Sequence, residues 1–479
     1  MTPPKITFIG AGSTVFARAL LSDLFTFPEL HGCSIALMDI DEERLADSKA
    51  MAGIEAANAG SSATIMATTD RRAALDSASY VINMIQVGGY RPSTVIDFEV
   101  PKQYGLRQTI GDTLGIGGIM RGLRTLPVLV DIARDMEELC PDALLLNYSN
   151  PMAILMWGLQ RQSRIRSAGL CHSVQGTAAE IAGFLGIPAA EIDYTCAGIN
   201  HLAFYLTLTH NSSDLYPALK QLLASGHYPA FERVRFSLLR DFGYFVTESS
   251  EHFSEYVPWY IKAGRDNLIE QFNVPLDEYP ARCEDQLADW LETRRALIPA
   301  GADSGDEIDL KRKPGMPGSW TRKLAAQQRS NPAMAESIRQ EMIERQRNKK
   351  AGHSGEYGSL IIHSMETNQP RVVYGNVANN GLIENLPPDC CVEVPCLVDR
   401  NGIRPIHVGQ IPPQLASLMQ TNINVQRMTV EASLTGKRDP IYQAAMLDPH
   451  TAAELSPDAI RSLVDDLIAA HGDWLPEFH

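Results

Sequence analysis

Short apolar runs alternate with amphipathic stretches along the first part of the chain. Ile6–Ile9 is apolar and ends at a glycine, and apolar side chains then recur at helical spacing from Val15 to Phe25. The same alternation continues, with further strands expected at Ser34–Met38, Tyr80–Ile85 and Ala143–Leu146 and helices at Asp41–Ala57 and Gly122–Leu139. Strands that alternate with helices predict an α/β fold with a parallel, doubly wound sheet.

The pattern changes near residue 196. Beyond it, expected helices are separated by irregular, aromatic-rich chain, and a Gly/Pro/Asp-rich stretch at Gly301–Ser319 is typical of a surface excursion. Ser330 and Pro332 predict the start of a highly charged helix to about Lys350, which we interpret as a solvated face. We therefore expect two domains, residues 1–195 and a larger α+β domain at 196–479. Its expected elements are helices at Leu215–Ala224, Arg233–Leu239 and Leu287–Leu297, strands at Val372–Tyr374 and Cys391–Val398, and a final helix capped by Ser456.

Charge and cysteine content narrow the class of protein. The 479 residues carry 57 Asp and Glu against 42 Lys and Arg, a net charge of −15, which disfavours nucleic acid and anionic lipid as partners. No apolar run reaches the ~18 residues of a membrane span, and no secretory signal precedes the first strand. The eight cysteines are scattered without a Cys-x-x-Cys pair. We expect reduced cysteines in a soluble, cytoplasmic protein.

The first strand-to-helix turn carries a partial dinucleotide fingerprint. Gly10 and Gly12 would let the backbone approach a pyrophosphate at the helix N-terminus, although the third small position of the motif falls on Val15. Asp39 ends the second expected strand, where a carboxylate can bind both ribose hydroxyls; as an alternative it is a turn or cap residue. Acidic neighbours at residues 41–43 would repel a 2′-phosphate. This combination predicts a Rossmann-type domain that binds NAD rather than NADP.

Three further segments carry candidate chemistry. Ile110–Arg121 contains four glycines and is expected to be a loop, either one that approaches a ligand or a mobile turn. Asn147–Pro151 follows a buried strand and either fixes a sugar or nicotinamide group or forms an Asx turn. Cys171 and His201 each end an apolar stretch, and thiolate and imidazole suit a transition metal. Their spacing matches no compact metal motif, however, and by itself favours a structural cysteine and a buried histidine.

Taken together, these motifs resemble family 4 glycoside hydrolases, and within them the melibiase-type α-galactosidases. The resemblance covers nearly the whole chain. It is carried by Gly10-Ala-Gly-Ser, Gln86-Val-Gly-Gly, Gly111-Asp-Thr-Leu-Gly, Asn147-Tyr-Ser-Asn-Pro, Cys171-His-Ser, Gly198-Ile-Asn-His, Thr247-Glu-Ser-Ser-Glu-His, Gly375-Asn and Val398-Asp-Arg-Asn-Gly.

The resemblance implies a lactate/malate dehydrogenase-like fold with a larger C-terminal domain, and NAD⁺ and a divalent metal, usually Mn²⁺, as cofactors. It implies hydrolysis of terminal α-galactosides by a cycle that departs from the two-carboxylate scheme of most glycosidases. NAD⁺ takes hydride from sugar C3, metal-assisted deprotonation at C2 drives elimination of the aglycone, water adds, and hydride returns to C3. A homodimer or homotetramer acting on a small sugar is expected by the same likeness.

Site residues follow from the resemblance, position by position. Cys171 and His201 match the metal ligands, and His172, which follows the ligand cysteine, stands where other branches carry an Asp that resembles a general acid. The C2 base has no clear counterpart; the candidates are Glu248, Glu251, His252 and Tyr256, of which we favour the two glutamates. The expected cofactor contacts are Gly10, Gly12, Ser13, Asp39, Gln86 and Asn147, with Asn150 and His172 at the sugar.

Other functions remain open at this stage. The same mechanism could serve an α-glucosidase, an α-glucuronidase or α-galacturonidase, or a 6-phosphoglycosidase. A plain NAD-dependent 2-hydroxy acid dehydrogenase is an alternative from another class, but its His-Ala-Gly-like catalytic motif is absent from the sequence and the second half is too long. A catalytically inert sugar or NAD sensor is disfavoured by the presence of both Cys171 and His201. Residues 301–355 are expected to be an insertion.

Overall fold

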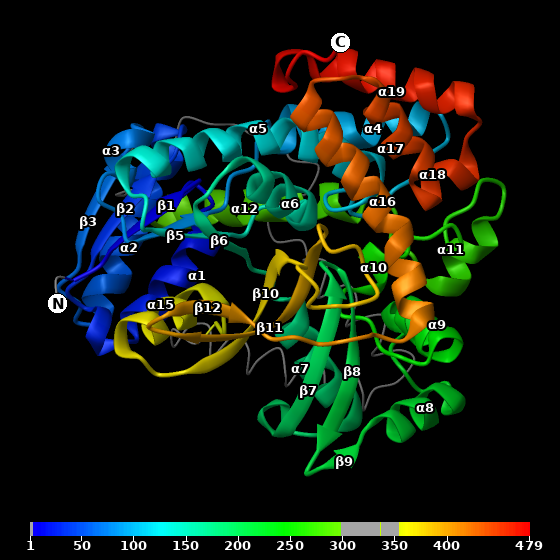
Figure 1. The fold of residues 1–479 in the computed structure, drawn as a ribbon, viewed down its shortest axis with the longest axis horizontal. Coiled ribbons are helices and arrows are strands. Elements are labelled where there is room, and N and C mark those ends of the chain that lie inside the picture. The colour runs from blue at the N-terminus through cyan, green and yellow to red at the C-terminus, as the bar shows by residue number, and fades with distance from the viewer. Residues whose placement is uncertain (1–2, 298–335, 337–353) are drawn as a thin grey trace.

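The computed structural model describes residues 3–297, 336 and 354–479. Within these ranges the strands form one 12-stranded sheet (Figure 1). Its first six strands lie in the order β3-β2-β1-β4-β5-β6 and pair in parallel. They are β1 (Lys5–Ile9), β2 (Ser34–Met38), β3 (Thr64–Thr68), β4 (Tyr80–Asn83), β5 (Leu144–Asn147) and β6 (Arg166–Gly169). This is the strand order of a dinucleotide-binding fold, so the predicted Rossmann-type sheet is confirmed.

Helices cover both faces of the parallel sheet, as the alternating apolar pattern requires. Figure 1 shows α5 and α6 on one side of the strands, with α1 and α15 (Tyr357–Thr367) on the other. The helices of this part are α1 (Thr14–Phe25), α2 (Glu42–Asn58), α3 (Arg71–Leu75), α4 (Val95–Gln103), α5 (Gly115–Leu139), α6 (Met152–Gln162) and α7 (Ser173–Leu185), with short helices η1 (Pro28–Leu30), η2 (Gly89–Thr94) and η3 (Ala189–Glu191).

The second half of the chain extends the same sheet with antiparallel strands. β10 (Arg371–Ala378) pairs with β6, β11 (Cys391–Asp399) pairs with β10 and β7 (Ile192–Ile199), and β8 (Leu202–His210) follows β7. β9 (Ser213–Asp214) and β12 (Gly402–Pro405) complete it. Strand β7 spans the expected boundary at residue 195, and one apolar core runs beneath both halves. The two-domain division remains a prediction.

Among the helices of the second half, α15 packs against β10 and β11, and the last four stack beside α5 and α4 (Figure 1). The final helix begins where Ser456 predicts it, because the serine side chain accepts a hydrogen bond from the Ala459 amide. The helices are α8 (Tyr216–Ser225), α9 (Arg233–Phe242), α10 (Ser250–Phe253), α11 (Asp266–Phe272), α12 (Glu278–Leu297), α15 (Tyr357–Thr367), α16 (Pro413–Thr435), α17 (Asp439–Leu447), α18 (Pro449–Glu454) and α19 (Pro457–His471), with η4 (Ala230–Glu232) and η5 (Gly472–Trp474).

Two expected helix starts were wrong. α5 begins at Gly115 rather than Gly122, so the glycine-rich segment is a loop only as far as Leu114. A Cβ on Gly117 would lie 2.3 Å from the Gly111 carbonyl oxygen, because the loop folds back on the first turn of the helix. Glycine therefore serves close packing inside this helix. α12 begins at Glu278, nine residues before the apolar periodicity begins at Leu287.

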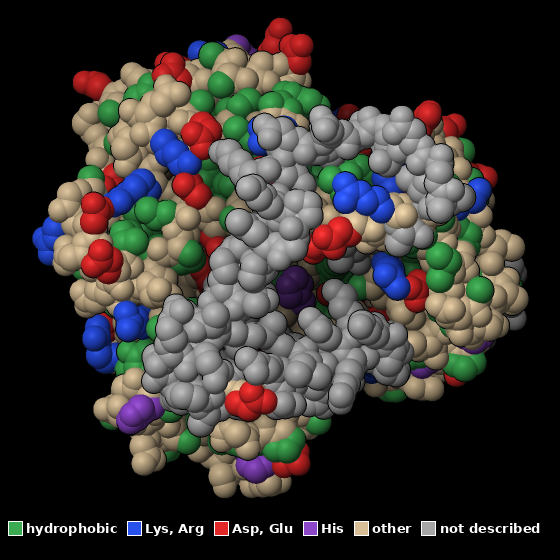
Figure 2. Space-filling view, turned by 180° about the vertical axis from the view of Figure 1, so that it is seen from behind, with side chains coloured by type: hydrophobic (Ala, Val, Ile, Leu, Met, Phe, Trp, Pro, Cys, Tyr) green, Lys and Arg blue, Asp and Glu red, His purple; other side chains and the backbone are tan. Residues whose placement is uncertain are grey.

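Several expectations concern residues outside the described part: the excursion at 301–319, the charged helix at 330–350 and most of the insertion at 301–355. Among the described residues, no helix combines the length and apolar character needed to cross a membrane. Figure 2 shows Lys and Arg interspersed with Asp and Glu over one face. All eight cysteines are free thiols, and seven of them are buried while Cys171 is partly exposed.

Candidate active site

The turn after β1 brings the fingerprint glycines against the acid that ends β2. Gly10 has a φ of +85°, and the Gly12 amide donates to Asp39 Oδ2 at 2.6 Å. A Cβ on Gly12 would lie 2.7 Å from that same oxygen. Only glycine therefore allows the loop and the carboxylate to approach this closely, as the fingerprint requires.

Helix α1, which follows this loop, presents an uncompensated N-terminus. Ser13 occupies its N-cap without a side-chain capping bond, and the first turn contains no acidic residue. Unpaired amides and the positive end of the helix dipole favour an anion at this position. The loop is thus suited to a pyrophosphate, with Asp39 beside it for a ribose.

Two of the expected cofactor contacts, Gln86 and Asn147, lie at the ends of the next strands. Gln86 follows β4, is exposed, and donates to Thr94 Oγ1 at 3.3 Å. Asn147, at the end of β5, is fully buried; its Oδ1 accepts from Asn83 at 2.8 Å and its amide group donates to the Ser149 carbonyl at 3.1 Å. Asn147 thus holds the turn in shape, whereas its direct contact with a cofactor remains a prediction.

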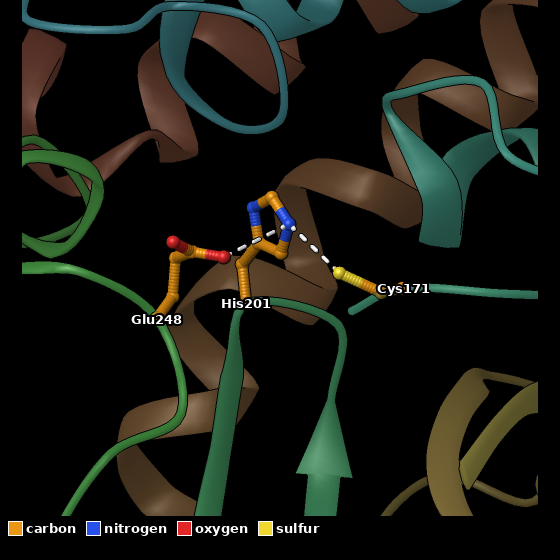
Figure 3. A group of neighbouring side chains, drawn as sticks. All are labelled: Cys171, His201 and Glu248. Carbon is orange, nitrogen blue, oxygen red and sulfur yellow. Dashed lines mark hydrogen bonds and ion pairs between the residues drawn. The ribbon is translucent and has the colours of Figure 1, made fainter. Parts of the chain in front are cut away.

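Cys171, His201 and Glu248 form a compact group, with ligand atoms within 4.8 Å of one another (Figure 3). His201 Nε2 lies 3.4 Å from Cys171 Sγ and 3.2 Å from Glu248 Oε2. Cys171 follows β6, His201 lies at the turn between β7 and β8, and Glu248 precedes α10. The two ligands expected from the sequence are therefore side by side, and the structure brings Glu248 to them as a third candidate ligand.

The charges in this group suit a divalent cation. Burial, followed by the nearby carboxylates of Glu393 and Glu248, raises the pKa of the Cys171 thiol far above its usual range. Burial alone would raise the pKa of Glu248, but the imidazoles of His252 and His201 outweigh it and lower this pKa well below normal. A divalent ion would compensate both the carboxylate and a thiolate, releasing the thiol proton.

Tyr256 lies behind the group rather than in it. Its hydroxyl is 3.2 Å from His201 Nδ1, and the side chain is fully buried. If Nε2 binds a metal, the ring proton is on Nδ1 and is donated to this hydroxyl, which fixes the ring orientation. Tyr256, one candidate for the C2 base, is thus placed to orient a ligand.

The remaining base candidates lie in different surroundings. His252 Nδ1 is 3.3 Å from Glu248 Oε1, and burial lowers the pKa of His252 to about 4. Its Nε2 lies 3.9 Å from Asp112 Oδ1. Glu251 is 3% exposed and lies 3.6 Å from Arg282. His172 is exposed at the N-cap of α7, next to Cys171.

Asn150 was expected at the site, but four polar residues near it were not identified individually from the sequence: Asp112, Arg121, Tyr279 and Arg282. Asn150 Nδ2 lies 3.4 Å from Asp112 Oδ2, and the Asn150 carbonyl accepts from Arg121 Nε at 3.1 Å. Arg121 also donates to the hydroxyl of Tyr279, on α12, at 3.0 Å. Asp112 and Arg121 belong to the glycine-rich segment, so its composition could have pointed to them. Nothing in the sequence could have pointed to Tyr279 and Arg282, because α12 is far along the chain from the other site residues.

Comparison with known proteins matches this architecture over most of the chain. The model "Family 4 glycosyl hydrolase" matches residues 5–187, and "Family 4 glycosyl hydrolase C-terminal domain" matches residues 196–451. The chain belongs to family 4 of the glycosyl hydrolases. The recognition based on sequence motifs is therefore confirmed.

Relatives with a named activity within family 4 are similar over most of their length. The chain is 48% identical to an alpha-galactosidase of Bacillus subtilis, covering 99% of each chain, and 34% identical to an alpha-galactosidase of Rhizobium meliloti, covering 99% of this chain and 89% of the relative. A solved 6-phospho-alpha-glucosidase from gut microorganisms, in complex with NAD and Mn2+, covers all of both chains with a TM-score of 0.75 at 18% identity. The latter likeness concerns the fold.

Proposed function

We propose that this protein is an α-galactosidase that requires NAD⁺ and a divalent metal such as Mn²⁺. The observation that carries the proposal is the Cys171–His201–Glu248 group, in which Cys171 follows β6 of the same sheet whose first strand leads into the glycine loop. The similarity to two alpha-galactosidases over 89–99% of their length supports galactose as the sugar, whereas relatives of 24–28% identity include enzymes for other sugars.

The polar residues around the group favour an uncharged sugar. Arg121 is bonded to the Asn150 carbonyl and to Tyr279, and Arg282 is paired with Glu278 at 3.0 Å. These two arginines already have protein partners, so a sugar phosphate or uronate could pair with them only by displacing those partners. Amide, carboxylate and imidazole groups at the same place can bind hydroxyls instead.

When bound, the cofactor would accept and return hydride at sugar C3, and the metal would polarise the oxygens at C2 and C3. Cys171, His201 and Glu248 would hold the metal, and Tyr256 would orient the His201 ring. His172, which is exposed at the N-cap of α7 next to Cys171, would donate a proton to the leaving glycosidic oxygen.

We propose His252 as the group that removes the C2 proton. Burial keeps its ring neutral, and a proton on Nδ1 can be donated to Glu248, which leaves Nε2 free to accept. Glu248 is engaged with His201, and Glu251 is buried beside Arg282. In D₂O, C2 exchange should be lost in His252→Asn and retained in Glu251→Gln; the reverse result would restore the glutamate assignment.

The function is tested by hydrolysis of an aryl α-galactoside with NAD⁺, Mn²⁺ and a thiol reductant, each omitted in turn. Activity should require both cofactors, and the released galactose should carry deuterium at C2 when the reaction runs in D₂O. Hydrolysis by metal-free, NAD-free protein, or a product without this label, would reject the mechanism. Accumulation of NADH would indicate a dehydrogenase instead.

Location and assembly are further parts of the proposal. A metal-binding thiolate at Cys171 survives best in a reducing compartment, which supports a cytoplasmic location. A homodimer or homotetramer is the proposed assembly, and sedimentation equilibrium would measure it.

A further inference from the structure

Helix α12 contacts the candidate site at two places, near Arg121 on the side of the metal group and near Arg44 on the side of the glycine loop. Near its start, Tyr279 accepts a hydrogen bond from Arg121, beside the metal group. One and a half turns later, Glu284 accepts from Tyr90 of η2, the short helix that begins three residues after Gln86. Further on, Trp290 packs against α2, beside the glycine loop. The helix thus follows the direction that a dinucleotide takes across this fold, from the switch point towards β2 (Figure 1).

The contact at the far end is a stacked cation and indole. The guanidinium carbon of Arg44 lies 4.2 Å from the centroid of the Trp290 ring, which is 6% exposed. Trp290 Nε1 donates to Asp47 Oδ2 at 3.1 Å, which fixes the plane of the indole. Arg294, one turn further along α12, forms two bonds with Glu43 at 2.9 and 3.0 Å. The end of α12 is therefore tied to the first turns of α2.

This arrangement places one positive charge at the rim of the glycine loop. Arg44 Nη1 donates to the Gly12 carbonyl at 3.4 Å, beside the contact between the Gly12 amide and Asp39. Around Arg44, the segment from Asp39 to Glu43 is otherwise acidic, with four carboxylates and the apolar Ile40. An anionic dinucleotide would meet repulsion here unless the guanidinium is held towards the loop. Trp290 holds it there by covering one of its faces.

We propose that Trp290 is a positioning residue of the cofactor site, which fixes Arg44 against the glycine loop so that α12 retains NAD at its adenosine end between turnovers. The inference rests on the proposed function, because NAD must bind at this loop. Retention is useful in such a cycle, since hydride taken from the sugar is returned to it and the cofactor need not be exchanged. A dehydrogenase, by contrast, must release its reduced cofactor after every turnover.

The test measures NADH binding and dissociation by fluorescence, without metal or sugar. Trp290→Ala should weaken binding about tenfold and raise the dissociation rate by a similar factor, since a partly buried cation–π contact has about this magnitude. Trp290→Phe keeps a ring under Arg44 and should restore most of the affinity. The control Trp259→Ala removes an indole stacked on Phe242 and should leave NADH dissociation unchanged.

A second pair of variants avoids a buried substitution. Arg44→Gln should reproduce the loss of NADH affinity with an unchanged melting temperature. Arg427→Gln removes a comparable arginine, stacked on Trp157 at 5.0 Å and paired with Asp389, and should have no effect on NADH. Unchanged dissociation in both Trp290→Ala and Arg44→Gln would overturn the inference while the proposed function stands. Failure of the unaltered protein to bind NADH would overturn both.

Discussion

Tyr256→Phe isolates the contribution of one hydroxyl to the metal site. In the folded protein this hydroxyl lies 3.2 Å from His201 Nδ1. The substitution leaves the side chains of Cys171, His201 and Glu248 unaltered. Phenylalanine fills nearly the same volume, so the packing around a fully buried side chain is preserved. The variant therefore changes how His201 is oriented without removing a ligand.

The expected loss follows from two independent estimates. Removing an outer partner of a metal-binding histidine typically weakens metal affinity by about 10–100-fold, or roughly 1.4–2.7 kcal/mol. Leaving a buried N–H without an acceptor costs about 1–3 kcal/mol, and water has no access to this fully buried position. The two ranges overlap, so we expect Mn²⁺ to bind about 10–100 times more weakly in Tyr256→Phe.

Mn²⁺ affinity can be measured by competition with a chelator, alongside the NADH affinity and the free energy of unfolding of metal-free protein. NADH binding should be unchanged. Tyr216→Phe is the matched control, because it also removes a buried hydroxyl, bonded to the Tyr205 carbonyl, and should lower stability without changing Mn²⁺ affinity. Equal Mn²⁺ affinity in Tyr256→Phe and the unaltered protein would refute the orienting role of the hydroxyl.

Three other predictions concern the ligands, the glycine loop and the C-terminus. Cys171→Ser removes a proposed direct ligand and should weaken Mn²⁺ binding by more than about 100-fold, beyond the loss of an outer partner, while NADH titration stays normal. Gly12→Ala should weaken NADH binding at least about tenfold, because the added Cβ would lie 2.7 Å from Asp39 Oδ2 and push the carboxylate away from the loop. Unchanged NADH affinity would mean that the cofactor binds elsewhere. His471→Ala removes a 2.9 Å bond to the buried carboxylate of Asp97 and should lower the free energy of unfolding by about 2 kcal/mol in urea titrations. No change in the midpoint would mean that this bond contributes nothing to folding.

Local sequence determined the parallel sheet and which strand ends carry the candidate binding residues. Apolar runs predicted β1, β2, β4 and β5 because a strand buried on both faces must be apolar throughout. The sequence also predicted that the glycines after β1 and the acid after β2 lie close together, since the carboxyl ends of parallel strands meet at one edge of the sheet. Cys171 and His201 were identified by resemblance to the family, and in the structure Cys171 Sγ lies 3.4 Å from His201 Nε2.

Tertiary structure decided the rest, because those contacts join segments that no local pattern links. Glu248 joins Cys171 and His201 only because the chain returns along β8, where Val246 bridges Phe204. Helix α12 likewise lies between Arg121 and α2 only through contacts of Tyr279 and Trp290 with residues far away in sequence. Gly117 indicated a loop by composition but lies in a helix, since close approach of the Gly111 carbonyl, not backbone flexibility, requires glycine there. Periodicity records which face of an element is buried, whereas the partner that buries it is chosen by the packing of the whole chain.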